Sequence, residues 1–289
     1  MKILPRTDLA LEDYENEEEK QIEEYDINNV NVQKIVLDSL NAKKYKKKAG
    51  VYFTITTNSI IDIEHDEATN ISKVLCKILE DIYENYNLTQ ESYILVLGLG
   101  NDEITPDSLG PKVVKNIFVT KHLFDLNHLD EGLGIIGAIA PGVMGQTGIE
   151  TSDIITALVK KTKPEMVLVI DALASRSLYR VNRTIQVSTA GISPGSGVGN
   201  KRKEISMETL GIPVVAIGVP TVVDIASIFY DFKDYFKEEN SEYDIRDSLD
   251  ESQLNYMVTN KDIDEMMNMM ADIISKAINV SIHNLEIYE

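Results

Sequence analysis

Short, continuous apolar runs alternate with segments of helical spacing along the chain, and this alternation limits the fold more than any other feature. Such runs are typical of strands buried on both faces, as in a parallel sheet covered by helices. We therefore predict an α/β fold with a mostly parallel sheet flanked by helices. The predicted strands are 93–97, 135–139, 166–170, 184–187 and 214–217, with a further β-rich stretch at 51–63.

The helical segments carry apolar residues that recur every three or four positions. In the last segment, Ile263, Met266, Met267 and Met270 begin a stripe that continues to Ala277. Methionines at this spacing indicate core packing rather than a metal or ligand site. The predicted helices are 67–82, 108–122, 151–161, 222–236 and 262–282.

Composition divides the chain into parts. Residues 1–30 are acidic and poor in apolar pattern, so we predict a mobile leader outside the core. A leader and β-rich segment over 9–66 then precedes an α/β domain over 67–289. Within that domain the stretch 237–255 is strongly acidic, which predicts an exposed insertion or hinge.

The acidic balance restricts the partners of the chain. Its formal net charge of −19, from 47 acidic and 28 basic residues, repels phosphate backbones, so we expect no direct nucleic-acid binding. The same negative charge would attract a basic substrate, or it serves only to keep the protein soluble. The chain contains no run of about 18 apolar residues, so we predict no membrane-spanning helix. Its N-terminus lacks the apolar stretch of a secretory signal. The single cysteine, Cys76, permits no internal disulfide and fits a buried thiol, so we expect a cytoplasmic protein.

Candidate catalytic residues follow the strands, because ligands of such sheets bind beyond the carboxyl ends of the strands. In the loop 98–111, Thr105 suits a helix N-cap and Pro106 suits the first helical position. Asp107 would then lie in the first helical turn. There it either serves chemistry or only stabilises the start of the helix.

Asp171 is the second candidate, since it ends an apolar strand where a buried carboxylate needs a partner. Arg176 or a capping role could supply that partner. Two carboxylates held close together cannot both ionise cheaply, so one pKa rises and the other falls. The charged member can activate water while the protonated member donates to the scissile carbonyl or the leaving amine. Asp107 and Asp171 together thus suggest peptide hydrolysis without a metal or cofactor.

Other chemistries fit the sequence less well. The glycine-rich loops 140–153 and 188–206 match neither common phosphate-binding signature. The chain contains no HExxH zinc motif and no GxSxG nucleophile elbow. The loop 188–206, with Lys201-Arg202-Lys203, either contacts an acidic or polar ligand or is a plain surface loop. We therefore predict no cofactor and no metal.

Several long motifs, in the same order, resemble the germination protease family: GLGNDEITPDSLGP, IAPGVMGQTGIETSDII, VIDALASRS and ISPGSGVGNKRKEISMETLGIPVVAIGVPTVVD. The similarity spans about 93–226, with RTDLALE near the N-terminus and MVT at 257–259. The resemblance implies an aspartic-type endopeptidase with Asp107 and Asp171 as catalytic residues. It also implies a fold related to the hydrogenase-maturation proteases, the phosphorylase/hydrolase-like fold.

The resemblance further implies a homotetrameric zymogen that degrades small acid-soluble spore proteins in the forespore or spore core. Substrates of the family are cut after an acidic residue and before a hydrophobic one, followed by alanine and a later glutamate. The sequence Asp8-Leu9-Ala10-Leu11-Glu12 imitates this pattern. We therefore predict residues 1–8 to be a propeptide that is removed by self-cleavage between Asp8 and Leu9.

Two other functions stay open at this point. A metal-dependent maturation protease of the hydrogenase-processing type would use Asp107 and Asp171 as metal ligands, although no histidine lies nearby in the sequence. A non-enzymatic protein would instead use the glycine-rich loops to hold a small ligand.

Overall fold

A computed structural model describes residues 7–14, 22–45, 47–57, 63–195, 202–232, 256–283 and 285. Residues 1–6 of the predicted propeptide and the predicted insertion at 237–255 lie outside these ranges. The strands are β1 (Glu23–Ile27), β2 (Val30–Leu37), β3 (Gly50–Thr56), β4 (Tyr93–Gly98), β5 (Ile135–Ile139), β6 (Met166–Ser175), β7 (Thr184–Ser188), β8 (Val214–Asp224) and β9 (Met257–Val258).

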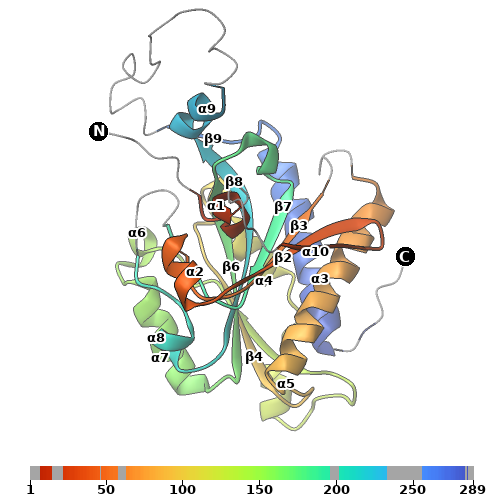
Figure 1. The fold of residues 1–289 in the computed structure, drawn as a ribbon. Helices are drawn as coiled ribbons and strands as arrows, with labels where there is room; N and C mark the ends of the chain where they lie inside the picture. Colours follow the sequence, from red (N-terminus) through yellow and green to blue (C-terminus); the bar gives the residue numbers. More distant parts are fainter. Residues whose placement is uncertain are drawn as a thin grey trace, which may run out of the picture.

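The longer helices cover the sheet, and short ones lie in its loops (Figure 1). The α-helices are α1 (Ala10–Tyr14), α2 (Ser39–Lys44), α3 (His65–Asn85), α4 (Leu109–Lys115), α5 (Lys121–Asp125), α6 (Met144–Thr147), α7 (Thr151–Thr162), α8 (Met207–Leu210), α9 (Ile225–Phe232) and α10 (Ile263–His283). Two 3-10 turns are η2 (Thr105–Asp107) and η3 (Leu178–Arg180).

One sheet runs through the described part of the chain in the order β1-β2-β3-β7-β8-β6-β4-β5, with β9 beside β8. The strands β5, β4, β6 and β8 are parallel neighbours, and β7, β3, β2 and β1 extend the sheet in antiparallel pairs. A tight turn through Asn28 and Asn29, both at positive φ, makes β1 and β2 a hairpin. The predicted α/β fold with a sheet flanked by helices is confirmed, and its parallel part is confined to these four strands.

The five predicted strands are all present, but β6 and β8 run on beyond their predicted ends. Their ladder continues through the pairs Asp171↔Gly218 and Ala172↔Val219. The sequence hides this extension because Asp171 interrupts the apolar run that signals a buried strand. Asp171 therefore lies inside β6 rather than at its end.

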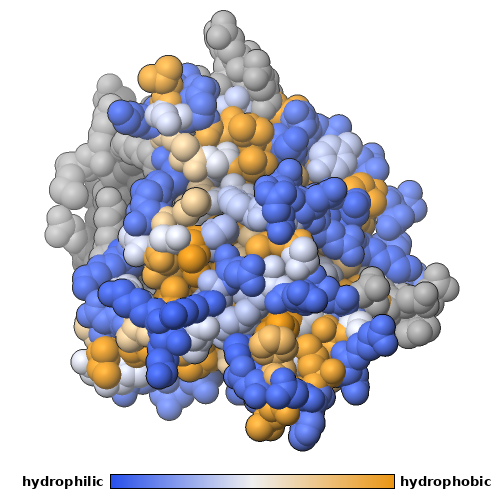
Figure 2. All heavy atoms as spheres, turned by 90° about the horizontal axis from the view of Figure 1, so that it is seen from below, coloured by the Kyte–Doolittle hydropathy of each residue, from blue (hydrophilic) through white to orange (hydrophobic). Residues whose placement is uncertain are grey.

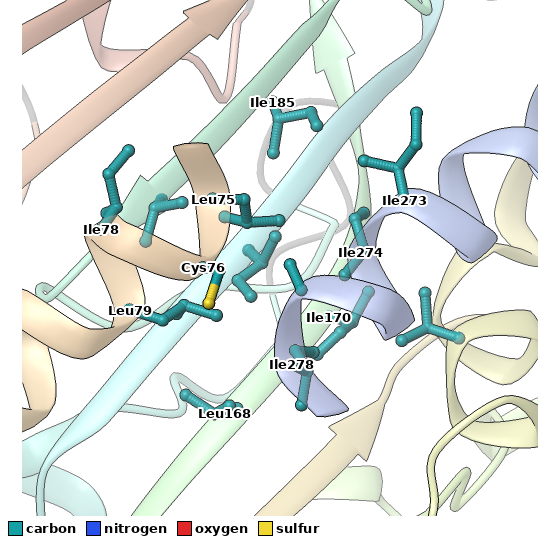
Figure 3. Packing of buried hydrophobic residues seen from close by; sticks show 14 of the residues in the cluster. Leu75, Cys76, Ile78, Leu79, Leu168, Ile170, Ile185, Ile273, Ile274 and Ile278 are labelled. Carbon is teal, nitrogen blue, oxygen red and sulfur yellow. The ribbon is translucent and has the colours of Figure 1, made fainter. Parts of the chain in front are cut away.

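The two faces of the sheet build two separate cores. Along β6, Met166, Leu168 and Ile170 pack against α3 and α10 (Figure 3), whereas Val167 and Val169 pack on the other side with Ile155 and Val159 of α7. This alternation is the period of two that a strand imposes on its side chains. Asp171 lies two residues beyond Val169, so its side chain points to the same side of the sheet as α7. There it faces the loops that precede α7.

The core residues of α3 and α10 behave as predicted. Met266, Met267 and Met270 are all buried in the cluster that covers one face of the sheet. Cys76 lies in the same cluster, and burial raises the pKa of its thiol to about 12, as expected for an unreactive core thiol. The methionine stripe is thus core, as its spacing indicated.

Two predicted helices are wrong in part. The helix predicted over 108–122 is split into α4 and α5, because tertiary partners replace helical hydrogen bonds between them. The Phe118 amide donates to Asn279 Oδ1 of α10, and the buried Thr120 hydroxyl donates to the Gly134 carbonyl beside β5. The helix predicted from 222 begins only at Ile225, because residues 222–224 belong to β8.

The prediction of a mobile leader over residues 1–30 is wrong for the residues that the structure describes there. Residues 7–14, here called the N-terminal segment, contribute Ala10, Leu11 and Tyr14 to a third buried cluster with Ile35 and Tyr52. Strand β1 then joins the sheet edge. The many acidic residues conceal these few apolar ones, whose partners lie far along the chain.

The surface is mainly hydrophilic. The face seen from below in Figure 2 shows hydrophobic patches separated by hydrophilic side chains. Among the described helices, none has the length and apolar character needed to cross a membrane.

Replacement of Leu11 by alanine should test whether the N-terminal segment belongs to the core. Leu11 is 0% exposed, so we expect Leu11→Ala to lower the free energy of unfolding by about 3 kcal/mol. Leu40→Ala is the matched control, because Leu40 is 80% exposed and its loss should change stability by less than about 0.5 kcal/mol. Equal urea denaturation curves for the two variants would show that the segment is not docked.

Candidate active site

Asp107 lies in the loop after β4, where glycines allow the chain to fold back on itself. Gly100 has a φ of +107°, and a Cβ there would lie 2.0 Å from the Asp107 carbonyl oxygen. A Cβ on Gly98 would likewise lie 2.2 Å from the Gly110 carbonyl oxygen. The sharp loop thus brings η2 against the end of β4, and Asp107 with it.

The predicted helix start at Thr105 is wrong. Residues Thr105–Asp107 form a separate 3-10 turn, and Ser108 is the N-cap residue of α4. The Asp107 carboxylate accepts a hydrogen bond from the Asn101 amide at 2.9 Å instead of serving a helix N-terminus. This removes the interpretation that Asp107 only stabilises the start of a helix.

Asp171 is 6% exposed and lies in β6, where it pairs with Gly218 of β8, one residue beyond the end of the ladder with β4. Its Oδ1 atom accepts a hydrogen bond from the Ala172 amide at 3.0 Å. Arg176, the partner expected from the sequence, does not line the cavity around Asp171; its amide donates to Glu12 instead. Burial without that cation makes ionisation of Asp171 costly.

Asp107 and Asp171 line the same cavity, which has a volume of about 390 Å³. Burial raises the pKa of Asp171 well above its ordinary value, and the negative charges of Asp107 and Asp8 raise it further. Burial also raises the pKa of Asp107, against the lowering effects of the Asn101 amide and the Arg202 charge. The two carboxyl groups therefore differ in environment, with Asp171 the one that holds a proton more tightly.

The cavity is also lined by the charged residues Asp8, Glu150, Arg202 and Lys203, and two of these affect the pKa values of the aspartates. Arg202 lines the cavity and its charge lowers the pKa of both aspartates. Asp8 also lines it, through a carboxylate that accepts from the Ala174 amide at 2.9 Å. The basic run at 201–203 was the signal for Arg202, but only the tertiary structure shows that its charge acts on two distant aspartates.

The glycine-rich loops predicted to carry chemistry form the other walls. Gly142, Thr151 and Ser152 come from the loop before α7 and its first turn, and Pro194 and Gly195 come from the loop after β7. Thr221 of β8 and Thr259 after β9 also line the cavity. Both stand in motifs of the family resemblance, but the sequence assigned neither of them a role. Among the described side chains, no group of three or more His, Cys, Asp or Glu residues is arranged to hold a metal ion.

Asp8, the first residue of the predicted scissile pair, lines this cavity. The Asp8 amide donates to the Ala174 carbonyl at 2.9 Å, which ties the segment to β6. Leu9 follows with its side chain fully buried. The first residue of the predicted pair thus shares a cavity with two carboxyl groups whose pKa values are both raised.

Known proteins resemble this chain over most of its length. The model of the germination protease family matches residues 5–248. The germination protease of Bacillus thuringiensis subsp. konkukian (strain 97-27) is 47% identical, over 81% of this chain and 67% of that protein. The germination protease of Bacillus mycoides (strain KBAB4) is 37% identical, over 98% of this chain and 95% of that protein.

One solved structure with some likeness is the NiFe hydrogenase maturation protease HycI from Thermococcus kodakarensis KOD1. It is 16% identical to this chain with a TM-score of 0.35, and the match covers 70% of this chain and 98% of that one. A likeness of this size supports no argument about site or activity.

Asp171→Asn should stabilise the protein at neutral pH. Because the folded-state pKa of Asp171 is raised above the ordinary 3.8, the folded state loses stability as pH rises from that value toward the raised one. Asparagine does not titrate. The free energy of unfolding of the variant should therefore exceed that of the parent, and by more as pH rises through this range. Urea unfolding at several pH values measures the difference.

The exposed Asp130 provides the matched control. Asp130→Asn should give a difference from the parent that hardly changes with pH. If Asp171→Asn behaves in the same flat way, Asp171 does not have the raised pKa that its burial implies.

Proposed function

Because this chain belongs to the germination protease family, we propose that it is a protease of the aspartic type in which Asp107 and Asp171 share one proton. One observation carries the proposal. Two carboxyl groups, one from the loop after β4 and one from β6, line a single cavity, and each has a pKa raised mainly by burial. That is the arrangement in which one group acts as base and the other as acid.

In this mechanism Asp107 is the base, because the Asn101 amide and Arg202 favour its charged form. It takes a proton from water as the water oxygen attacks the scissile carbonyl carbon. Asp171 gives its proton to the carbonyl oxygen. When the tetrahedral intermediate collapses, the C–N bond breaks, the leaving amine takes the proton from Asp107, and the carbonyl re-forms as Asp171 recovers its own.

We further propose that the chain is a zymogen that cuts itself between Asp8 and Leu9. Support comes from the position of Asp8, which lines the cavity together with the two catalytic candidates. By family resemblance, the later substrates are small acid-soluble spore proteins in the spore core. The strongly negative charge of the chain would favour the approach of basic segments of such substrates.

Loss of either aspartate should stop self-processing. We expect Asp107→Asn and Asp171→Asn each to slow the conversion of the full chain by about 100-fold or more, since each removes one proton-transfer group. Asp102→Asn is the control, because Asp102 lies in the same loop, is exposed and does not line the cavity. Gel electrophoresis follows the conversion, and N-terminal sequencing should find Leu9 as the new first residue.

Normal processing in either aspartate variant would remove the mechanism, and a different new N-terminus would move the cleavage site. Abolition of wild-type processing by a chelator would favour the metal-dependent alternative.

Self-processing should also be faster in mild acid than at neutral pH. A pair that needs one proton gains its active form as pH falls toward the raised pKa of Asp171. The measurement is the initial rate of processing at a series of pH values and constant ionic strength. A rate that does not change from neutral to mildly acidic pH would argue against a shared proton.

A further inference from the structure

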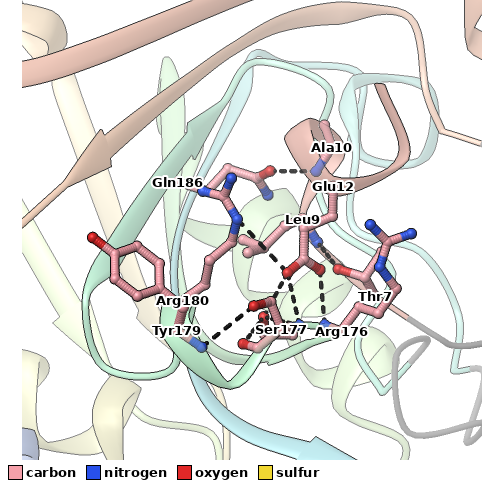
Figure 4. Close-up of polar contacts among 10 residues, drawn as sticks. Thr7, Leu9, Ala10, Glu12, Arg176, Ser177, Tyr179, Arg180 and Gln186 are labelled. Atoms are coloured by element: carbon pink, nitrogen blue, oxygen red, sulfur yellow. Dashed lines mark hydrogen bonds and ion pairs between the residues drawn. The ribbon is translucent and has the colours of Figure 1, made fainter. Parts of the chain in front are cut away.

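The N-terminal segment is anchored in the protein after the bond between Asp8 and Leu9. There the Leu9 side chain is fully buried, and the Glu12 carboxylate accepts a hydrogen bond from the buried Ser175 hydroxyl at 2.7 Å (Figure 4). Hydrolysis also requires that the part before the bond be held, because a carbonyl that turns away from the acid and the water does not react. The contacts of Thr7 and Asp8 therefore determine how the bond is presented.

Lys47 contacts the segment before the bond. Its Nζ atom donates a hydrogen bond of 2.9 Å to the Thr7 carbonyl oxygen. Its main chain is fixed at the end of α2, where the Lys47 amide donates to the Ala42 carbonyl at 2.9 Å. The side chain is only 13% exposed, so little water competes for the ammonium group. A charge-assisted hydrogen bond in such a place is stronger than one at the open surface.

The peptide unit between Thr7 and Asp8 is held at both of its polar atoms. Lys47 binds its carbonyl oxygen, and its N–H, the Asp8 amide, donates to the Ala174 carbonyl of β6 at 2.9 Å. The Leu9 amide, which belongs to the next peptide unit, donates to Thr7 Oγ1 at 3.0 Å (Figure 4). The unit before the predicted cleavage point is therefore fixed, and the predicted scissile unit is tied to it.

The same ammonium group reaches across the predicted cleavage point. Lys47 Nζ lies 3.1 Å from Asp13 Oδ2, and Asp13 is the fifth residue after the bond. The Asp13 side chain is partly exposed, so this ion pair alone contributes little. The contact with the Thr7 carbonyl differs, because a main-chain acceptor is present in every peptide whatever its side chains.

We infer that Lys47 is a positioning residue that holds the main-chain carbonyl of the second residue before the bond to be cut. The inference rests on the proposed proteolysis. In the full chain this carbonyl is that of Thr7. Cleavage releases it with the propeptide, and the corresponding carbonyl of a substrate then takes its place. Lys47 thus orients a peptide without selecting a side chain at that position.

The first test follows self-processing of the full chain. Lys47→Met keeps the length of the side chain but removes the donor, and we expect it to slow processing by about 10-fold or more. Lys47→Arg keeps a cation with N–H donors and should recover most of the rate. Lys48→Met is the matched control, because the neighbouring Lys48 pairs with Glu204 at 2.8 Å, and its rate should change by less than about 2-fold. Processing of Lys47→Met at the parent rate would overturn the inference.

The second test separates positioning from a merely structural role of Lys47. Two peptides with the sequence of residues 3–14, one of them with sulfur in place of the Thr7 carbonyl oxygen, are offered to each protein after processing in mild acid. Sulfur accepts hydrogen bonds weakly, so the parent protein should cut the sulfur peptide with a kcat/KM about 5-fold or more lower. Lys47→Met should cut the two peptides with values that differ by less than about 2-fold, as expected when the interacting donor is already gone. Lys48→Met should keep the ratio of the parent.

The outcomes distinguish this inference from the proposed function. Equal cutting of the two peptides by the parent protein overturns the role of Lys47 while proteolysis stands. The same ratio in the parent and in Lys47→Met also overturns it, and a lower free energy of unfolding of that variant would then identify a structural role. Absence of both self-processing and peptide cleavage in the parent protein removes the proposed function itself.

Discussion

The burial of a carboxyl group inside a parallel sheet is the constraint on which the rest of this structure depends. Asp171 lies buried within β6 beside β8, where ionisation is disfavoured. The strand cannot shift to expose it, because its neighbours in the ladder continue to Ser175. Asp171 is therefore a rigidly held acid that retains its proton. The loops around it determine what it can react with.

The same strand also organises the peptide that would be cut. Beyond Asp171, Ala174 pairs with Asp8, and the turn that follows binds Glu12. Asp171 and the residues that hold Asp8 and Glu12 therefore belong to one strand and the turn at its end. Only Asp107 must be brought in separately, by the glycine-dependent loop after β4. This arrangement is consistent with an N-terminal segment that belongs to the core and is also a substrate.

Much of the site could be anticipated from the sequence, because its two aspartates follow apolar runs that indicate neighbouring strands. Their meeting in one cavity is what the rule about carboxyl ends of parallel strands leads one to expect. Arg202 and Asp8 could not be added in this way. Each lies far along the chain from the aspartates it influences, and such contacts leave no periodic signal.

The sequence by itself determined the α/β class, the five predicted strands and the core stripe of α10, since periodicity records which side chains avoid water. It also determined the family, through motifs long enough to be specific. Only the tertiary structure decided that β6 continues past Asp171 and that the acidic N-terminal segment is buried. The physical reason is the same in both cases: a carboxylate is read as exposed unless its partners are known, and those of Glu12 lie more than 160 residues away.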